Sequence, residues 1–317
     1  MKAFDICVVG EINLDLILYG LPQELVLERE LLADGLALTL GSSSAIFAHN
    51  LATLGTKVSF VSMIGNDALG KIALERLTAP GVDVSAVRQS QSSTQTGLTV
   101  ILPSGKQRYI LTYPGAMFEF QYSDIDLNHV RSCRHLHLSS YFLHRALRPQ
   151  IRELFREARA AGLTTSLDTN DDPEDRWDAD LFQVLEHVDI LFVNEREAPR
   201  MAHEEDYARA IDRLAKSVRI LVAKRGAEAS ICRSDGNEWR AAPPSVSVVD
   251  TVGAGDSFAA GFIHQFLKGS ELQDCLAFAN VAGAYSTTKE GGTEAFRDRA
   301  ALQNFIQQHA RRGATRA

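Results

Sequence analysis

The fold of this chain is decided by one stretch, Asp250–Phe258, which reads DTVGAGDSF. The segment 243–249, with two prolines and a β-branched run, precedes it and predicts a short strand. Gly253 and Gly255 allow a tight turn, and from Ala254 onward apolar residues recur at helical spacing. The glycines are therefore expected at a helix N-terminus, where free backbone N–H groups and the helix dipole favour an anion.

Asp256 stands in the first turn of this expected helix, which Gly269 is expected to end. In one interpretation Asp256 only caps the helix and the glycines only form a turn. In the other, Asp256 takes a proton from a hydroxyl while the turn stabilises a transferring phosphoryl group. The stretch alone leaves both interpretations open, so the rest of the chain has to decide.

Composition excludes several classes of protein. The 317 residues are 45% hydrophobic, which suits one large α/β domain or two modest ones. The net charge is −7 and the basic residues are scattered, which argues against nucleic acid as a partner. No apolar run reaches the roughly 18–20 residues that span a bilayer, and no signal-peptide pattern opens the chain. The four cysteines show no C-x-x-C pairing, so we expect reduced thiols in a cytoplasmic protein.

Strands and helices alternate through the second half of the chain. Helices are expected near 149–161, 178–186 and 205–217, and strands at 163–168, 189–193 and 220–223. This alternation predicts a mostly parallel sheet covered by helices on both faces, with ligands bound beyond the carboxyl ends of its strands. Polar residues follow these strands: Asp168, Asn170, Asn194, Glu197, Lys224 and Gly226.

The N-terminal part predicts a polar face rather than a dinucleotide site. The strand at 5–9 is not followed by the glycine pattern of a dinucleotide-binding turn. Instead Asn13 and Asp15 alternate with apolar residues, so they point the same way, which suits either a polyol ligand or an exposed strand face. The runs 96–100 and 108–112 predict a hairpin in an appended sheet.

Two patterns resemble functional motifs but favour structural roles. Residues 65–72 have the spacing of a Walker A loop, yet Ile72 replaces the Ser/Thr that binds magnesium and Asp67 adds a negative charge, which favours a capped helix start. His135 and His137 share one face of a strand at 134–142, without a third metal ligand nearby, which favours a polar strand face.

The stretch Asp250–Phe258 resembles the C-terminal signature of the ribokinase-like (PfkB) carbohydrate kinases, and the similarity runs from Gly10 to Gly292. The resemblance implies a single kinase domain over 1–317: a three-layer α/β/α sandwich with a mostly parallel central sheet. It also implies a small β-sheet lid, formed by insertions at approximately 11–40 and 94–116, that closes over the sugar.

The resemblance assigns roles position by position. Asp256 is the expected base, and Gly253, Ala254 and Gly255 the anion hole. Asn194 and Glu197 match the family's N-x-x-E element, in which Glu197 organises Mg²⁺ through water. The remaining expected assignments are Lys224, Gly226 and Asn280 for ATP, Asp250 for K⁺ activation, and Asn13, Asp15, Gly41, Ser42 and Asn170 for the sugar.

Two departures from the family concern the acceptor. The family's N-terminal signature has a second glycine and an asparagine where this chain has Ser42 and Ile46. The loss of the asparagine amide argues against ribose and suggests a less hydroxylated substrate, or one held by Ser43, Ser44 or His137. The acidic run 168–172 would repel a carboxylated sugar.

The leading hypothesis is an ATP-dependent kinase acting on a primary hydroxyl of a neutral sugar or sugar-like molecule. A nucleoside kinase on the same scaffold is the alternative within this class, and a catalytically silent nucleotide or sugar sensor is the alternative outside it. We expect no nucleic-acid or membrane partner. Because paired lid edges would protect each other, we expect a homodimer formed through the lid.

Overall fold

The computed structural model describes residues 2–22, 24–104, 107–177, 180–309 and 315–316. Its centre is a sheet of ten strands in the order β14-β13-β12-β11-β10-β9-β8-β1-β4-β5. The pairings from β5 to β11 are parallel, and those from β11 to β14 are antiparallel. The strands are β1 Phe4–Val9, β4 Val58–Ile64, β5 Asp83–Gln89, β8 Cys133–Ser139, β9 Thr164–Asp168, β10 Ile190–Asn194, β11 Ile220–Lys224, β12 Ser230–Ser234, β13 Asn237–Ala241 and β14 Thr315–Arg316.

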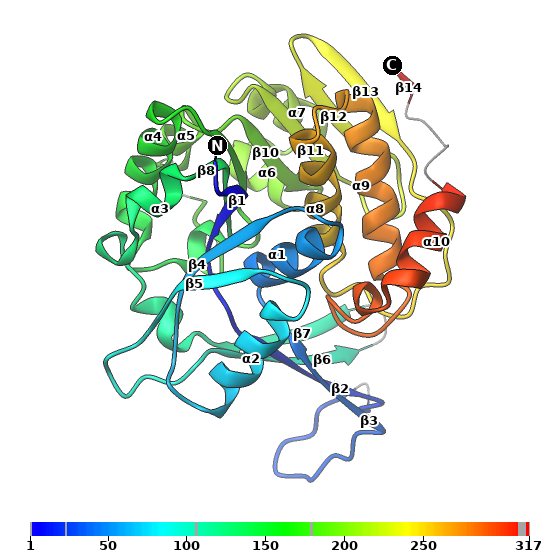
Figure 1. The fold of residues 1–317 in the computed structure, drawn as a ribbon. Helices are drawn as coiled ribbons and strands as arrows, with labels where there is room; N and C mark the ends of the chain where they lie inside the picture. Colours follow the sequence, from blue (N-terminus) through cyan, green and yellow to red (C-terminus); the bar gives the residue numbers. More distant parts are fainter. Residues whose placement is uncertain (1, 23, 105–106, 178–179, 310–314, 317) are drawn as a thin grey trace.

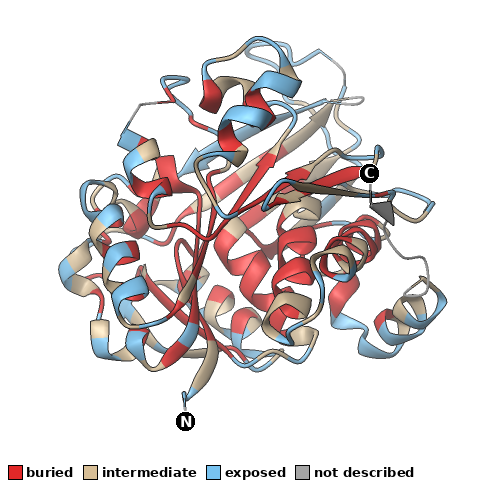
Figure 2. Cartoon of the chain, turned by 90° about the horizontal axis from the view of Figure 1, so that it is seen from above, coloured by how far each residue is buried: buried red, intermediate tan, exposed pale blue. Residues whose placement is uncertain are grey.

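Helices cover both faces of this sheet (Figure 1). Ile6 and Val8 of β1 pack into one apolar core, and Cys7 and Val9 pack into the other, as the period of two in a strand requires. The first core contains α1 Ser43–Thr53, α2 Ala68–Thr78, α8 Ala254–Leu267 and α9 Leu272–Ser286. The second contains α3 Leu127–Arg131, α4 Ile151–Ala160, α5 Asp180–Leu185, α6 Glu197–Ala202 and α7 Tyr207–Ala215, while α10 Arg299–His309 packs on α9. Figure 2 shows the buried residues concentrated in the strands and the helix sides that face them. The expected three-layer α/β/α fold is confirmed.

A separate four-stranded sheet, here called the lid sheet, has the order β3-β2-β6-β7. Its strands are β2 Leu14–Tyr19, β3 Gly35–Leu40, β6 Leu98–Ser104 and β7 Gln107–Tyr113. The small sheet expected from these segments is present, although residues 105–106 of the hairpin lie outside the described residues. Across β2 and β6, Asp15 pairs with Thr99 and Ile17 pairs with Ile101, so the four side chains share one face of the lid sheet. On this face Ile17 and Ile101 pack with Val252.

The strand expected at 243–249 is not formed. This segment has no partner in either sheet among the described residues, and Val248 and Val249 are more than half exposed. Pro243 and Pro244 lack the N–H that a sheet ladder needs, and the amide of Val249 bonds instead to the carbonyl of Thr287 at 2.8 Å. The chain therefore enters the turn at Gly253 as a segment that is not paired with any of the described strands.

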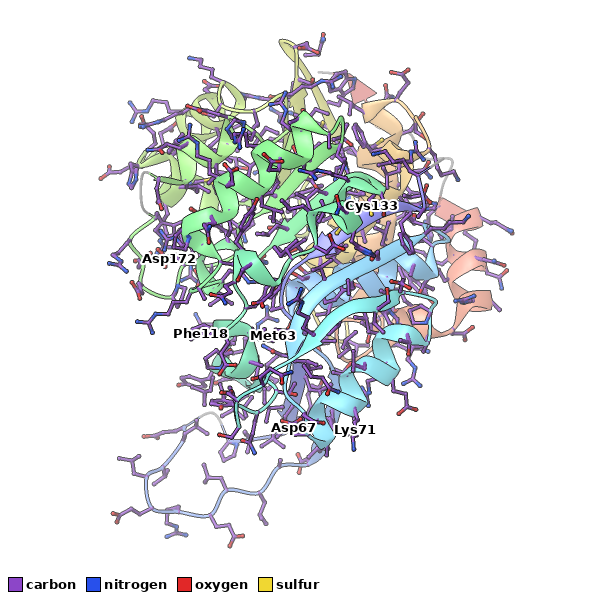
Figure 3. The ribbon with its side chains drawn as sticks, turned by 60° about the vertical axis from the view of Figure 1, so that its left-hand side comes forward. Met63, Asp67, Lys71, Phe118, Cys133 and Asp172 are labelled. Atoms are coloured by element: carbon purple, nitrogen blue, oxygen red, sulfur yellow. The ribbon has the colours of Figure 1, made fainter. Side chains whose placement is uncertain are left out.

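The remaining structural expectations are resolved locally. Asp67 caps α2 by accepting a hydrogen bond from the amide of Gly70 at 2.8 Å, so the Walker-like stretch is a capped helix start (Figure 3). His135 and His137, which the sequence placed on a polar strand face, are fully buried. His137 stacks on Phe47, and its two ring nitrogens pair with Ser166 and Ser139. None of the described helices is long and apolar enough to cross a membrane, and all four cysteines are buried and unbridged.

Candidate active site

The turn before α8 has the backbone that the glycines were expected to provide. Gly253 is the N-cap with φ 70° and ψ 5°, and no side chain caps the helix. The first amides of α8 lack partners within the helix, and that of Ala254 makes only a long bond of 3.3 Å to the carbonyl of Thr251; such an end of a helix suits an anion, and it is here called the anion cradle. A Cβ at Gly255 would lie 3.4 Å from Lys224 Nζ, which places a second positive group beside these amides.

Asp256 lies in the first turn of α8 without serving as its cap, and it is only 8% exposed. Burial raises the pKa of its carboxyl to about 7, and the charges of Asp168 and Glu11 add to this effect. Lys224 and a hydrogen bond from Ser43 oppose it. A carboxyl poised near neutrality beside an anion cradle has the properties of a general base.

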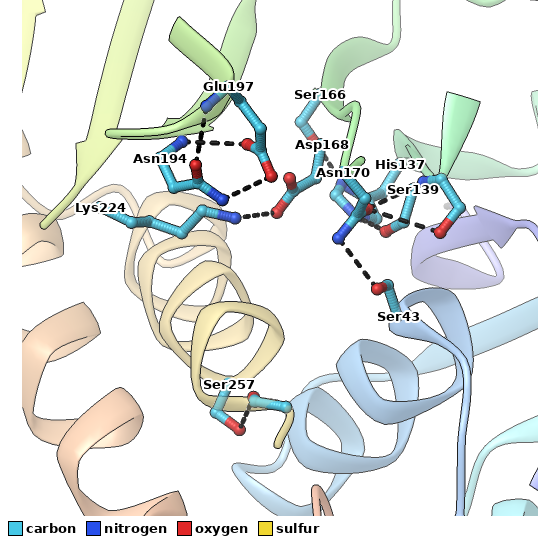
Figure 4. Close-up of polar contacts among 12 residues, drawn as sticks. Ser43, His137, Ser139, Ser166, Asp168, Asn170, Asn194, Glu197, Lys224 and Ser257 are labelled. Atoms are coloured by element: carbon cyan, nitrogen blue, oxygen red, sulfur yellow. Dashed lines mark hydrogen bonds and ion pairs between the residues drawn. The ribbon is translucent and has the colours of Figure 1, made fainter. Parts of the chain in front are cut away.

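Lys224 and Asp168 form a buried ion pair at the ends of β11 and β9, with 2.6 Å between Nζ and Oδ2 (Figure 4). Burial opposes the charge of Lys224, but the carboxylates of Asp168 and Glu197 outweigh it and raise its pKa. The other oxygen of Asp168 is buried without a partner among the described residues. An unpaired carboxylate oxygen at this place is a feature that a bound ligand or water would satisfy.

Asn194 and Glu197 bond to each other reciprocally at the end of β10. The amide nitrogen and side-chain nitrogen of Asn194 donate to the two carboxylate oxygens, and Asn194 Oδ1 accepts from the amide of Glu197 at 2.9 Å. Glu197 is 5% exposed, and burial raises its pKa to about 7. Among the described residues no group of three or more His, Cys, Asp or Glu could hold a metal ion. Any Mg²⁺ here would therefore keep most of its ligands as water and phosphate oxygens, which is its usual preference.

Asn13 and Asp15 converge on the same region from the lid sheet. Both are buried, and Asn13 Oδ1 has no hydrogen-bond partner among the described residues. A Cβ at Gly41 would lie 2.1 Å from Asp15 Oδ1, and one at Gly97 would lie 2.1 Å from Asn13 Oδ1, so glycine is required at both positions. Burial and the charge of Asp256 raise the pKa of Asp15 to about 7.

The other expected site residues, Asn280, Gly226 and Asp250, lie in three different surroundings. Asn280 Nδ2 donates to Ser230 Oγ and to two backbone carbonyls, so this nitrogen is used in packing α9 against the sheet. Gly226 lies in the exposed turn after β11 with φ 56° and open space around it. The Asp250 carboxylate accepts from the amides of Val252 and Gly291 and from Tyr19 Oη. Their roles toward ATP and K⁺ stay predictions.

Ile46, which the sequence suggested for the acceptor region, packs against the glycine turn before α8. It is 3% exposed and its methyl groups lie against Gly253 and Gly292; a Cβ at Gly292 would come within 2.5 Å of Ile46 Cδ1. His137 is stacked and bonded as described above, Ser43 bonds Asn170, and Ser44 bonds Glu11. Ile46 therefore lies between the turn at Gly253 and the backbone at Gly292.

Ser42 has a strained backbone. Its φ of 67° and ψ of 132° lie outside the ordinary left-handed region, in a conformation that is essentially restricted to glycine, and its buried hydroxyl has no partner among the described residues. Such strain is often found at ligand sites. Asn170, with φ 54°, adopts the milder left-handed conformation.

Ser42→Gly should therefore raise the free energy of unfolding of the ligand-free protein by about 1 kcal/mol, because glycine adopts this backbone without strain. Denaturant unfolding measures the change. Asp235→Gly is the control: with φ 48° in a surface turn, Asp235 is expected to gain only a few tenths of a kcal/mol. A loss of stability in Ser42→Gly would contradict the prediction.

Several site residues were missed from the sequence. Glu11 and His144 form a buried pair at 3.3 Å, and Arg108 of the lid sheet donates to Thr251 Oγ1 at 3.3 Å. Glu11 directly follows the first strand, so the rule that ligands bind beyond strand ends could have found it. Nothing in the sequence pattern indicates that Arg108 contacts the stretch Asp250–Phe258.

Comparison with known proteins agrees with this fold and site. Residues 3–299 match the model of the pfkB family carbohydrate kinases. An ATP-dependent ribose-1-phosphate kinase of Halopiger xanaduensis is 29% identical over 80% of this chain and 82% of its own. A putative ribokinase II from E. coli, in its apo form, superimposes with a TM-score of 0.85 at 25% identity, over 96% of this chain and 100% of its own. Arabidopsis thaliana ribokinase, complexed with ribose and ATP, gives 0.79 at 26% identity, over 96% and 99%.

The fold and the match to the family model define a carbohydrate kinase, which is a phosphotransferase. The chain belongs to the pfkB family.

Proposed function

We propose that this protein transfers the γ-phosphoryl group of ATP to a primary hydroxyl of a neutral sugar or sugar-like small molecule. The observation that carries the proposal is the buried Asp256, with its pKa raised to about 7, in the first turn of a helix whose N-terminus is an uncapped glycine turn. One group can accept the proton of the acceptor hydroxyl while the adjacent amides stabilise charge on the transferring phosphoryl group.

The chemistry follows from positions within the site. Asp256 takes the hydroxyl proton, and the amides of Gly253, Ala254 and Gly255 bind the phosphoryl oxygens. Lys224, kept charged by Asp168, lies beside Gly255 and adds positive charge where the phosphate would sit. Its tie to Asp168 fixes the ammonium group in place, so little reorganisation is needed when the phosphate arrives.

The nucleotide would contact Asn194, Lys224, Gly226 and Asn280. Glu197 would organise Mg²⁺ through water, since both of its oxygens already accept hydrogen bonds from Asn194. When bound, Mg²⁺ neutralises charge on the nucleotide phosphates. Asp250 would lie at a K⁺ site, and activation by K⁺ is part of the proposal.

The acceptor would bind between the lid sheet and the end of the central sheet, at Asn13, Asp15, Gly41, Ser42 and Asn170. The unpaired atoms Asn13 Oδ1 and Ser42 Oγ suit the hydroxyl groups of a polyol. Asp15 and Asp256 are both buried carboxyls here, and their mutual repulsion disfavours a further negative charge on the acceptor. These features support a neutral acceptor.

The test is an ADP-release assay with purified protein, ATP and Mg²⁺, with and without K⁺. The panel contains neutral sugars, sugar phosphates, acidic sugars and nucleosides. The proposal predicts release with one or more neutral sugars. Release only with nucleosides would replace it with the nucleoside kinase, release only with sugar phosphates would refute a neutral acceptor, and ligand binding without release would indicate a sensor.

The lid sheet would close over the acceptor and exclude water. It already contacts the decisive stretch through Tyr19 Oη, which donates to Asp250 at 3.2 Å, and through the Arg108–Thr251 contact. Its outer face is apolar and exposed, with Leu36, Leu111 and Tyr113 at least half exposed. This face supports a homodimer formed through the lid sheet.

Leu111→Lys should therefore shift the protein from dimer toward monomer, because it places a charge on the apolar face that forms the proposed interface. Sedimentation velocity over a range of concentrations measures the change. Val248→Lys, equally exposed but outside both sheets, is the control and should leave the dimer intact. A monomeric wild-type protein at all concentrations would contradict the proposed dimer.

A further inference from the structure

Glu11 is a fully enclosed carboxylate that the proposed chemistry does not use. It follows β1 and is 2% exposed. Its oxygens accept hydrogen bonds from Ser44 Oγ and Ser140 Oγ, each at 2.7 Å, and a longer one from the amide of Ser44 at 3.3 Å. His144 Nε2 lies 3.3 Å from Glu11 and 3.1 Å from the carbonyl of Ser139; because both partners are acceptors, this nitrogen carries a hydrogen.

The hydrogen bonds of Glu11 close a ring through four segments of the site. Ser140 donates its amide to Asn170 Oδ1 at 3.0 Å, and Asn170 Nδ2 donates to Ser43 Oγ at 2.9 Å. Ser43 and Ser44 are neighbours at the start of α1, so the ring returns to Glu11. The four segments follow β1, open α1, follow β8 and follow β9; Figure 4 shows the Asn170–Ser43 link.

The ring is built with little freedom. A Cβ at Gly10 would lie 1.9 Å from Ser44 Oγ, so the chain before Glu11 has room only for glycine. Ser140 and Asn170 both hold left-handed backbones, with φ 55° and 54°. Conformations of this kind in residues other than glycine persist only when the surrounding contacts fix them.

We propose that Glu11 is a positioning residue: it holds Ser43 and Asn170 in the orientation that the base Asp256 and the acceptor require. Ser43 is the link to the base, since its hydroxyl lies close enough to the Asp256 carboxyl to lower that group's pKa. Asn170 is the link to the acceptor, because its bonds to Ser140 and Ser43 fix the plane of its amide. The inference rests on the proposed role of Asp256.

Glu11 also acts on Asp256 through its charge. Burial would raise the pKa of Glu11, but the hydrogen bond and the electrostatic attraction of His144, together with hydrogen bonds from Ser44 and Ser140, outweigh it and lower that pKa, so Glu11 stays ionised. The charged groups that face Asp256 are Asp168, Glu11 and Lys224, and its interaction with Asp15 is also repulsive. Removing the charge of Glu11 should therefore lower the pKa of Asp256.

The test is Glu11→Gln, which keeps the size of the side chain and one acceptor but removes the charge. We expect kcat to fall by about tenfold or more, because a misplaced base or acceptor is costly, and the KM for ATP to stay unchanged. The acid limb of kcat/KM against pH should move to lower pH. A role in stability alone would leave this limb where it is.

Asp189→Asn is the matched control. Asp189 is also a buried carboxylate that accepts from a backbone amide and a hydroxyl, those of Thr165, but it lies just before β10, at the end of the strands opposite to the site. It should lower stability without moving the pH limb. If Glu11→Gln does not fold, Ser140→Ala takes its place: it breaks the ring but keeps the charge, so it should lower kcat with the limb unmoved.

The outcomes separate this inference from the proposed function. If Asp256→Asn keeps its activity, the base assignment fails whatever Glu11 does. If Asp256→Asn is inactive while Glu11→Gln, or Ser140→Ala in its place, keeps the wild-type kcat and pH limb, the role of Glu11 is overturned.

Discussion

Asp256→Asn should lower kcat by about 10³-fold, because a positioned general base contributes roughly 10²–10⁴ to a proton transfer. Asparagine keeps the shape of the side chain but cannot accept the proton of the acceptor hydroxyl. Binding of ATP, measured by calorimetry, should change little, since the amides of the turn remain. In the wild-type protein kcat/KM should fall below about pH 7, as protonation of the raised carboxyl removes the base.

The control for this prediction is Asp274→Asn. Asp274 is likewise an acidic residue in the first turn of a helix, but it lies on the surface at the start of α9. It should leave kcat unchanged. A kcat for Asp256→Asn close to that of the wild-type protein would show that the base is another group, or that Asp256 has only a local structural role.

Gly253→Ala is the second change with a large expected effect. Gly253 has φ 70°, and an added Cβ would lie 2.6 Å from the Cα of Gly292, which is backbone and cannot turn aside. The turn must therefore move, and its amides lose their alignment with the phosphoryl oxygens. Loss of one such donor costs roughly 10²–10³ in kcat in comparable sites, so we expect a fall of at least about 10²-fold in steady-state assays.

Gly269→Ala separates strain from displacement. Gly269 follows the other end of α8 with φ 79°, and an added Cβ would meet nothing within 4 Å. It imposes a similar backbone strain without a clash, so it should lower stability and leave kcat unchanged. A Gly253→Ala variant that is less stable but retains normal kcat would argue against the anion cradle.

The sequence predicted those features that depend on local pattern. The glycine turn, α8 and the parallel strands follow from backbone freedom and periodicity, and both are local properties. The prediction of a strand at 243–249 was wrong. β-branched residues form a strand only with a partner strand, and the two prolines lack the N–H groups that such pairing needs. The position of Ile46 could not be predicted, since it depends on Gly253 and Gly292, which are more than 200 residues away.

The candidate site was predictable as a set of strand ends but not as a network. Lys224 and Asp168 were both expected near the site, yet their ion pair depends on the register of three adjacent strands. The ring through Glu11 depends on left-handed backbones at Ser140 and Asn170, which nothing in the sequence marks. Such contacts depend on how distant segments of the chain are placed in the folded protein, which local sequence patterns do not specify.

The crowding of carboxyls has a consequence for the fold as a whole. Asp15, Glu197 and Asp256 each have a pKa raised to about 7, so between about pH 4 and pH 7 the folded chain holds protons that the unfolded chain releases. By linkage, the contribution of these three groups to the free energy of unfolding falls as the pH rises through this range, whereas buried histidines such as His49 and His264, whose pKa values burial lowers to about 4, contribute with the opposite sign. At neutral pH the raised pKa values of these three site carboxyls therefore lower the free energy of unfolding. The groups that are poised to react reduce the stability of the fold that positions them.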